Sequence, residues 1–194
     1  MDTTPMTHQE PISVQQYLQL EERTEGKHEY RVGQVVAMGG ASRRHGLLTG
    51  ALYATLLPHA RSKGCQLFIV AMKVRIDHEG DSWFYYPDLV LSCDPADRDP
   101  AYTAYPCLLV EVLSPSTETI DSREKLLAYH LLPSLREYLM LRQDRLQADL
   151  YQRGDDGRWH HYHLTEAEDT VPLRCLDVQP KLADIYFDVP ELTG

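Results

Sequence analysis

The spacing of apolar residues near the N-terminus predicts a helix followed by a hairpin. Ser13 with Gln16 three residues later matches the capping-box pattern, and apolar residues then recur on one helical face. The stretch "HEYRVGQVVAM", residues 28–38, has the pattern of two short strands that turn at Val32 and Gly33. We therefore expect a helix and a hairpin ahead of the main part of the chain.

A second helix and a long strand are expected next. The stretch "GGASRRHG", residues 39–46, leads into leucines at helical spacing, and Pro58 is expected to kink this helix or end it early. In "QLFIVAMKVRI", residues 66–76, alternate positions are apolar, which predicts one long strand. A turn at residues 77–81 should return the chain.

Two later strands each carry one acid inside an apolar run. They are "YYPDLVLSCD", residues 85–94, with Asp88, and "CLLVEVLSPSTETID", residues 107–121, with Glu111. Burying an ionised carboxylate is costly unless it is paired, hydrogen-bonded or bound to a cation. Two such acids on neighbouring strands indicate a shared site.

The second half of the chain predicts a crossover and a final hairpin. A helix beginning near Asp121 follows the Glu111 strand, Pro133 should stop it, and "REYLML" at residues 136–141 forms the next strand. Strands joined by a helix at this spacing are parallel neighbours. A hairpin closing at residues 156–157 completes an α/β (α+β) fold with a mixed sheet, in one domain covering residues 1–194.

Strand parity places the two acids on defined faces. Asp88 shares a face with Val90, and Glu111 shares one with Leu109 and Leu113. If the two strands pair so that these faces coincide, the carboxylates converge. Paired carboxylate oxygens with open positions for water suit Mg²⁺ or Mn²⁺. The alternative is that each acid only hydrogen-bonds a loop amide or an arginine.

Composition and charge narrow the classes of function. The chain is 43% hydrophobic and 25% charged, as in a soluble globular protein, and no apolar run approaches the ~20 residues of a membrane helix. The net charge is −10, but residues 1–80 carry nine basic against eight acidic side chains, so a polyanion would have to meet this half. No GxSxG, P-loop or Rossmann glycine pattern is present.

The cysteines and the N-terminus indicate a cytoplasmic protein. The four cysteines are widely spaced without a CxxC pair, and most lie in or beside apolar runs, where free thiols act as small hydrophobes. The first residues lack the basic and apolar regions of a secretory signal. We expect reduced cysteines and no structural zinc.

The two acids and their surroundings resemble a nuclease superfamily. Pro87-Asp88 followed by Glu111 on the next strand is similar to the PD-(D/E)XK pattern. Together with "LLVEVLSPSTETID", "REKLLAYHLLPSLREYL" and "HEYRVGQVVAMGGAS", the chain resembles the Uma-type restriction endonuclease family from about residue 12 to 187. The resemblance implies a restriction-endonuclease-like core with an N-terminal helix-hairpin-helix addition. It also implies Mg²⁺- or Mn²⁺-dependent hydrolysis of phosphodiester bonds, with Asp88, Glu111 and the Val112 carbonyl as metal ligands.

The sequence departs from the superfamily at the expected lysine. That lysine stands two residues after the second acid, and here the position is Leu113. A substitute cation is needed, and Lys125 is the first candidate, with Asp121 four residues earlier to steer its ammonium. Lys73 is the rival, because one strand register would place it on the Asp88 face.

Further polar residues are expected near substrate. By resemblance, Glu29 completes the catalytic site. His45 could contact phosphate, and Arg43 and Arg44 could bind an anion at the N-terminus of the second helix. Each of these side chains could instead be an ordinary surface residue.

The histidine-rich segment "WHHYH", residues 159–163, is left out of the predicted site. His161 and His163 share a strand face, but without an identified acid beside them they are typical of a solvated hairpin.

The resulting functional hypothesis is a cytoplasmic, divalent-metal-dependent DNA endonuclease that forms a homodimer. Two alternatives stay open: a nuclease fold that has lost catalysis and serves as a binding or regulatory module, or a metal hydrolase of small phosphodiesters. Leu113 favours the first alternative, and the acidic charge fits both.

Overall fold

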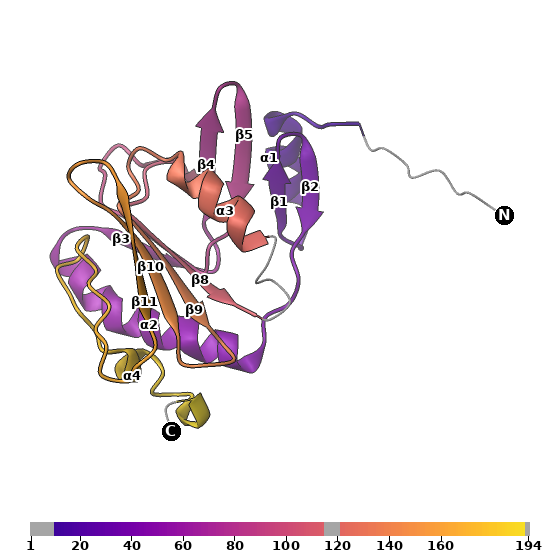
Figure 1. The fold of residues 1–194 in the computed structure, drawn as a ribbon. Helices are drawn as coiled ribbons and strands as arrows, with labels where there is room; N and C mark the ends of the chain where they lie inside the picture. Colours follow the sequence, from indigo (N-terminus) through magenta and orange to yellow (C-terminus); the bar gives the residue numbers. More distant parts are fainter. Residues whose placement is uncertain (1–9, 115–120, 193–194) are drawn as a thin grey trace.

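The chain folds around two β-sheets, one of six strands and one of five (Figure 1). The computed structural model describes residues 10–114 and 121–192. In the six-stranded sheet the order is β11-β10-β9-β8-β6-β3, and in the five-stranded sheet it is β2-β1-β5-β4-β7. The expected mixed sheet is therefore present, and a second sheet accompanies it.

The six-stranded sheet holds the predicted crossover. β8 and β9 are parallel neighbours joined through α3, while the other pairs in this sheet are antiparallel. The predicted strands at Glu111 and "REYLML" and the final hairpin are confirmed. The strands are β3 (Gln66–Ile69), β6 (Leu89–Ser92), β8 (Leu108–Leu113), β9 (Glu137–Arg142), β10 (Ala148–Arg153) and β11 (Trp159–Leu164).

The five-stranded sheet contains the predicted N-terminal hairpin. Val32 and Gly33 both have positive φ, which is the conformation of a tight type I′ turn, and a Cβ on Gly33 would lie 2.6 Å from the Pro11 side chain. Glycine is therefore required there. The strands are β1 (His28–Arg31), β2 (Gln34–Ala37), β4 (Lys73–His78), β5 (Asp81–Tyr85) and β7 (Tyr102–Thr103).

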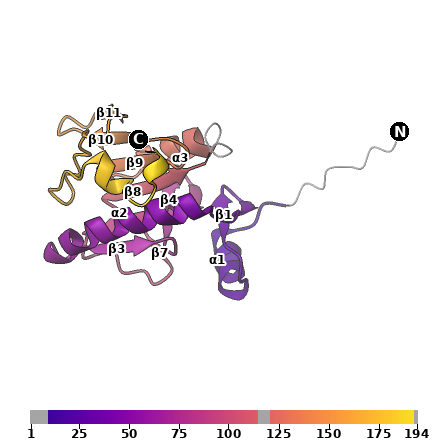
Figure 2. The same ribbon diagram turned by 90° about the horizontal axis from the view of Figure 1, so that it is seen from below.

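Helices cover both faces of the six-stranded sheet. One face packs on α2, whose Leu52 and Leu56 are fully buried against Val110 of β8 and its neighbours. The other face packs on α3, through Tyr129 and residues such as Leu109. The view from below shows α2 lying across the strands (Figure 2). The helices are α1 (Val14–Arg23), α2 (Arg43–Ser62), α3 (Asp121–His130) and α4 (Leu182–Ile185), with a 3₁₀ turn at Pro190–Leu192.

The second helix does not end early at Pro58, which was one of the two outcomes expected for it. The capping box at Ser13 begins α1 as expected, and α2 follows the hairpin, but α2 continues past Pro58 to Ser62. The proline removes one backbone hydrogen bond. Burial of Leu56 and Ala60 on either side of Pro58 outweighs that loss, so the helix does not end early. It forms a layer of the core as well as the end of the helix-hairpin-helix segment. Among the described helices, none is long and apolar enough to cross a membrane.

The expected long strand at residues 66–76 is wrong. It is divided into β3 and β4, which belong to different sheets. Val70 lies between them with a φ of 55°, its N–H donates to the Asp88 carbonyl (2.8 Å), and its carbonyl accepts from the Lys27 ammonium. Of the alternating apolar residues only Val74 and Ile76 are buried, and Val70 is 43% exposed, so the alternation did not reveal the break.

The expectation of free thiols is also wrong. Cys65 is bonded to Cys93, and Cys107 is bonded to Cys175. These pairs are 28 and 68 residues apart in sequence, so only the folded chain brings the thiols together. The first bond joins β3 to the end of β6, and the second joins the start of β8 to the C-terminal segment.

Candidate active site

The strand register brings the two predicted acids together. β6 pairs with β8 so that Val90 lies opposite Leu109 and Leu89 lies opposite Val110. The next position in this register sets Asp88, one residue before β6, opposite Glu111. Both side chains line one pocket at the start of β6.

Asp88 is held by groups from two elements. Its Oδ2 accepts a hydrogen bond from the Val112 N–H at 2.7 Å, and its Oδ1 lies 2.7 Å from Nε2 of His45. His45 sits in the first turn of α2, where its own N–H donates to Ser42 Oγ. Hydrogen bonding to Asp88 raises the pKa of His45 against the effect of burial, and the charges of Asp88 and Glu111 raise it further.

Glu111 is almost fully enclosed between β8 and α3. It is 7% exposed, and its Oε1 accepts from Lys125 Nζ (3.2 Å) and from the Tyr129 hydroxyl (3.0 Å). Burial raises its pKa to about 7, with contributions from the nearby charges of Asp88 and Glu29 and opposition from Lys125. The Glu111 carboxyl is therefore harder to ionise than an ordinary glutamate.

Lys125 connects the two sheets. Its Nζ lies 2.7 Å from Glu29 Oε1 on β1 as well as 3.2 Å from Glu111 on β8. Burial disfavours the ammonium, yet Glu111 and Glu29 raise the pKa of Lys125 well above its usual value, so it stays charged. Arg31 adds a second link, with Nη2 2.7 Å from Glu29 and Nη1 3.0 Å from Glu124 on α3.

These side chains surround a pocket of about 270 Å³. The loop from Ala37 to Ser42 forms one wall, and Leu113 and Tyr138 form part of another. The charged side chains lining it are Glu29, Arg31, His45, Asp88, Glu111 and Lys125.

The other predicted site residues are not among those that line this pocket. Lys73 is on β4 in the five-stranded sheet, with its ammonium 5.4 Å from the ring centre of Tyr86, and burial lowers its pKa. Arg43 and Arg44 are exposed in the first turn of α2, and Arg44 Nε lies 2.9 Å from Glu191. None of the three lines the pocket. The expected steering of Lys125 by Asp121 concerns a side chain outside those described.

The donor set fits a hard divalent cation. Asp88 and Glu111 supply carboxylate oxygens, and the Val112 backbone lies against both Asp88 and His45. Burial raises the pKa of Glu111, and the charges of Asp88 and Glu29, which a bound cation would offset, raise it further. Within the described residues, the pocket does not gather three Asp, Glu, His or Cys ligand atoms within 4.8 Å of one another. Such a cation would therefore keep several waters, as Mg²⁺ usually does.

Two residues of the site were missed from sequence. Tyr129 stands one helical turn after Lys125, and Arg31 stands two residues after Glu29 on the same strand face. These spacings are visible in the sequence and place each residue on the same face as a predicted site residue. Their significance depended on knowing that α3 and β1 meet at Glu111, which is a tertiary contact.

Comparison with models of known protein families identifies the family of this chain. The chain matches the Uma2 family, described as "Putative restriction endonuclease", over residues 14–183, and it belongs to this family. This confirms the resemblance drawn from Asp88, Glu111 and their surroundings.

Relatives and a solved structure agree with that assignment. The uncharacterized protein slr1290 of Synechocystis is 36% identical over 176 residues, covering 90% of this chain and 91% of its own. A second Synechocystis protein, the uncharacterized sll1609, is 31% identical over 150 residues, covering 76% and 84%. The crystal structure of a putative nuclease belonging to DUF820 from Anabaena variabilis has a TM-score of 0.71 at 16% identity, covering 91% and 98%. The last comparison shows that the fold is shared.

Proposed function

We propose that the protein is a divalent-metal-dependent endonuclease that hydrolyses phosphodiester bonds of DNA. The observation that carries this proposal is the meeting of Asp88 and Glu111 on adjacent strands, in one pocket with the Lys125 ammonium. Membership of the Uma2 family supports the same reaction class.

Asp88, Glu111 and the Val112 carbonyl would hold Mg²⁺ or Mn²⁺. A bound cation of this kind supplies Lewis-acid activation of water and offsets charge on a phosphate. The protein's own contribution is rigid placement: the Val112 N–H fixes Asp88, and Tyr129 fixes Glu111. Precise placement of this kind lowers the entropic cost of reaction.

Lys125 takes the part of the lysine missing at Leu113. Its ammonium is charged, so it acts as a hydrogen-bond donor and a positive charge rather than as a proton acceptor. We assign it the orientation of the attacking water and stabilisation of the charge that develops on the phosphate. Glu29, 2.7 Å from Nζ, holds the ammonium in place from the opposite sheet.

DNA would approach along the wall formed by residues 37–42 and the start of α2. The N-terminus of this 20-residue helix favours phosphate, and Arg43 and Arg44 are exposed there. Arg44 would exchange Glu191 for phosphate. His45, against Asp88, lies between this surface and the acids. Lys73 would contact DNA more distantly.

Cleavage of both strands calls for two sites, so we propose that the protein acts as a homodimer. We place its action in the cytoplasm, where its DNA substrate would be found. Disulfides are rare in a reducing cytoplasm, so the Cys65–Cys93 and Cys107–Cys175 bonds count against this placement.

Plasmid cleavage with Mg²⁺ or Mn²⁺ tests the proposed activity. Wild type should convert supercoiled plasmid to nicked and linear forms, and Asp88→Ala and Glu111→Ala should not. Equal cleavage by all three proteins rejects the mechanism. Plasmid binding without cleavage by wild type would support the non-catalytic module instead. Turnover of bis(p-nitrophenyl) phosphate without plasmid cleavage would support the hydrolase of small diesters.

A further inference from the structure

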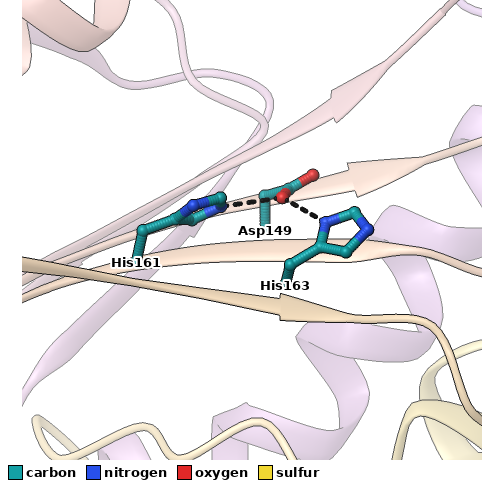
Figure 3. Close-up of side chains that lie close together, drawn as sticks. All are labelled: Asp149, His161 and His163. Atoms are coloured by element: carbon teal, nitrogen blue, oxygen red, sulfur yellow. Dashed lines mark hydrogen bonds and ion pairs between the residues drawn. The ribbon is translucent and has the colours of Figure 1, made fainter.

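A second group of metal-ligating side chains lies on the β10–β11 hairpin. Asp149 of β10 is the direct cross-strand partner of His163 of β11, and His161 stands two residues before His163 on the same face. Figure 3 shows both imidazole rings turned toward the Asp149 carboxylate. The sequence had set these histidines aside because no acid was visible beside them, and the strand pairing supplies that acid.

The three side chains converge on one point. His161 Nε2 and His163 Nδ1 each lie 2.8 Å from Asp149 Oδ1. Within the part of the chain that the structure describes, this is the one place where three such ligand atoms all lie within 4.8 Å of one another. Convergence of this kind from two hydrogen-bonded strands is fixed by backbone pairing rather than by chance surface contact.

Neighbouring residues hold the ligands in orientation. Gln147 Nε2 donates to Asp149 Oδ2 at 2.7 Å, which leaves Oδ1 directed at the imidazoles. Tyr151 stacks on the His161 ring at 4.5 Å with planes 11° apart. Such outer contacts are a general feature of metal sites, where they fix ligand geometry.

We propose that Asp149, His161 and His163 bind a late first-row divalent ion, represented by Zn²⁺. Two imidazoles and one carboxylate are a ligand set suited to such ions, and three protein ligands leave positions for water or a further donor. The imidazoles are 43% and 55% exposed, so an ion can reach them. Ligand atoms ~2.0–2.2 Å from a tetrahedral Zn²⁺ lie farther from one another than the present 2.8 Å contacts, so small ring rotations at this surface would open the contacts to admit the ion.

This site is separate from the proposed active site but shares its sheet face. The strand register gives a row in which Glu111 lies beside Met140, Met140 beside Asp149, and Asp149 beside His163. Two strand spacings separate Glu111 from Asp149, roughly 10 Å. Metal binding at the hairpin therefore has to be measured apart from binding at Asp88 and Glu111.

Calorimetric titration with ZnCl₂ tests the proposal. The background is Asp88→Asn with Glu111→Gln, in the full chain. This background should bind one Zn²⁺, and adding His161→Ala with His163→Ala should abolish that saturable binding. Adding His160→Ala instead should leave it unchanged, because this exposed histidine occupies the opposite face of the same strand.

Imidazole ¹⁵N NMR of the background protein provides a second measurement. It distinguishes loss of the metal ligands from misfolding of the variant, because it observes the histidines in a protein that retains them. Zn²⁺ should shift the ring nitrogens of His161 and His163 but not those of His160. Unchanged Zn²⁺ binding in the variant lacking both histidines, or no saturable binding in the background protein, would overturn the proposal. Neither result depends on plasmid cleavage, so the two proposals stand or fall separately.

Discussion

The ammonium of Lys125 lies 3.2 Å from the carboxylate of Glu111, although the two residues belong to a helix and a strand 14 positions apart in sequence. Leu113, which occupies the position of the usual lysine, is instead packed in the apolar cluster between α3 and the sheet. The cation beside Glu111 therefore comes from Lys125 on α3, and not from a lysine on β8.

Replacing Lys125 should separate its catalytic role from a structural one. Lys125→Met should reduce the rate of plasmid cleavage by about 100-fold or more, the size of effect seen when one transition-state hydrogen-bond donor is removed. With DNA saturated by enzyme, Lys73→Met should reduce the rate far less, because Lys73 is proposed to contact DNA at a distance and does not line the pocket. Single-turnover cleavage with Mn²⁺ measures both. A loss of rate in Lys73→Met equal to that in Lys125→Met would contradict the assignment.

The same substitution should also affect stability. Lys125→Met leaves Glu29 and Glu111 buried without the cation they share, and breaking a buried ion pair costs about 3–5 kcal/mol. Urea unfolding in EDTA measures this. Lys125→Arg retains the charge and should recover part of the stability. Equal stability of Lys125→Met and wild type would show that the three groups are not paired.

The raised pKa of Glu111 predicts a specific pH dependence of stability. The carboxyl titrates near 4.5 ordinarily and at about 7 in the fold, so between these values the folded chain binds more protons than the unfolded chain. The contribution of Glu111 to the free energy of unfolding should therefore fall as pH rises from 4.5 to 7 and level off above. Urea unfolding at several pH values in EDTA measures it. Glu111→Gln should remove this decline, and an identical pH profile in the variant would refute the shift.

The two disulfides predict that the protein has no reactive thiols and that removing one bond lowers its stability. Denatured, unreduced protein should show no thiols toward a thiol reagent, since all four cysteines are paired. Cys107→Ala with Cys175→Ala opens the longer loop and should lower the free energy of unfolding by about 4 kcal/mol on the chain-entropy estimate. Four reactive thiols in protein purified without reductant would contradict the pairing.

Pro58 predicts a gain in stability. The proline interrupts backbone hydrogen bonding inside α2 and is exposed, so Pro58→Ala can restore one bond without disturbing the core. We expect stabilisation of about 1–3 kcal/mol, given the ~3 kcal/mol difference in helix propensity. Thermal unfolding checks it, and a lower midpoint in the variant would show that Pro58 makes favourable contacts.

Local patterns predicted most of the elements because their causes are local. The capping box at Ser13 and the turn at Val32-Gly33 each depend on residues close in sequence. The parallel pairing of β8 with β9 followed from the order strand, helix, strand along the chain. The face of Glu111 also followed from simple alternation along β8.

The errors arose where contacts distant in sequence decide the structure. The break at Val70 is fixed by Asp88 and Lys27, and the disulfides join residues far apart. The carboxylate beside His161 and His163 comes from the opposite strand, so the spacing of the histidines alone could not show it. The single-domain division and the catalytic roles stay predictions.

Manganese binding tests most directly whether Asp88 and Glu111 share a cation. Mn²⁺ titration followed by electron paramagnetic resonance should be performed on protein carrying His161→Ala and His163→Ala, which removes the hairpin ligands. We predict one bound Mn²⁺ in this background and none after addition of Asp88→Asn with Glu111→Gln, both variants remaining folded by circular dichroism. Undiminished Mn²⁺ binding after both acids are replaced would contradict the account.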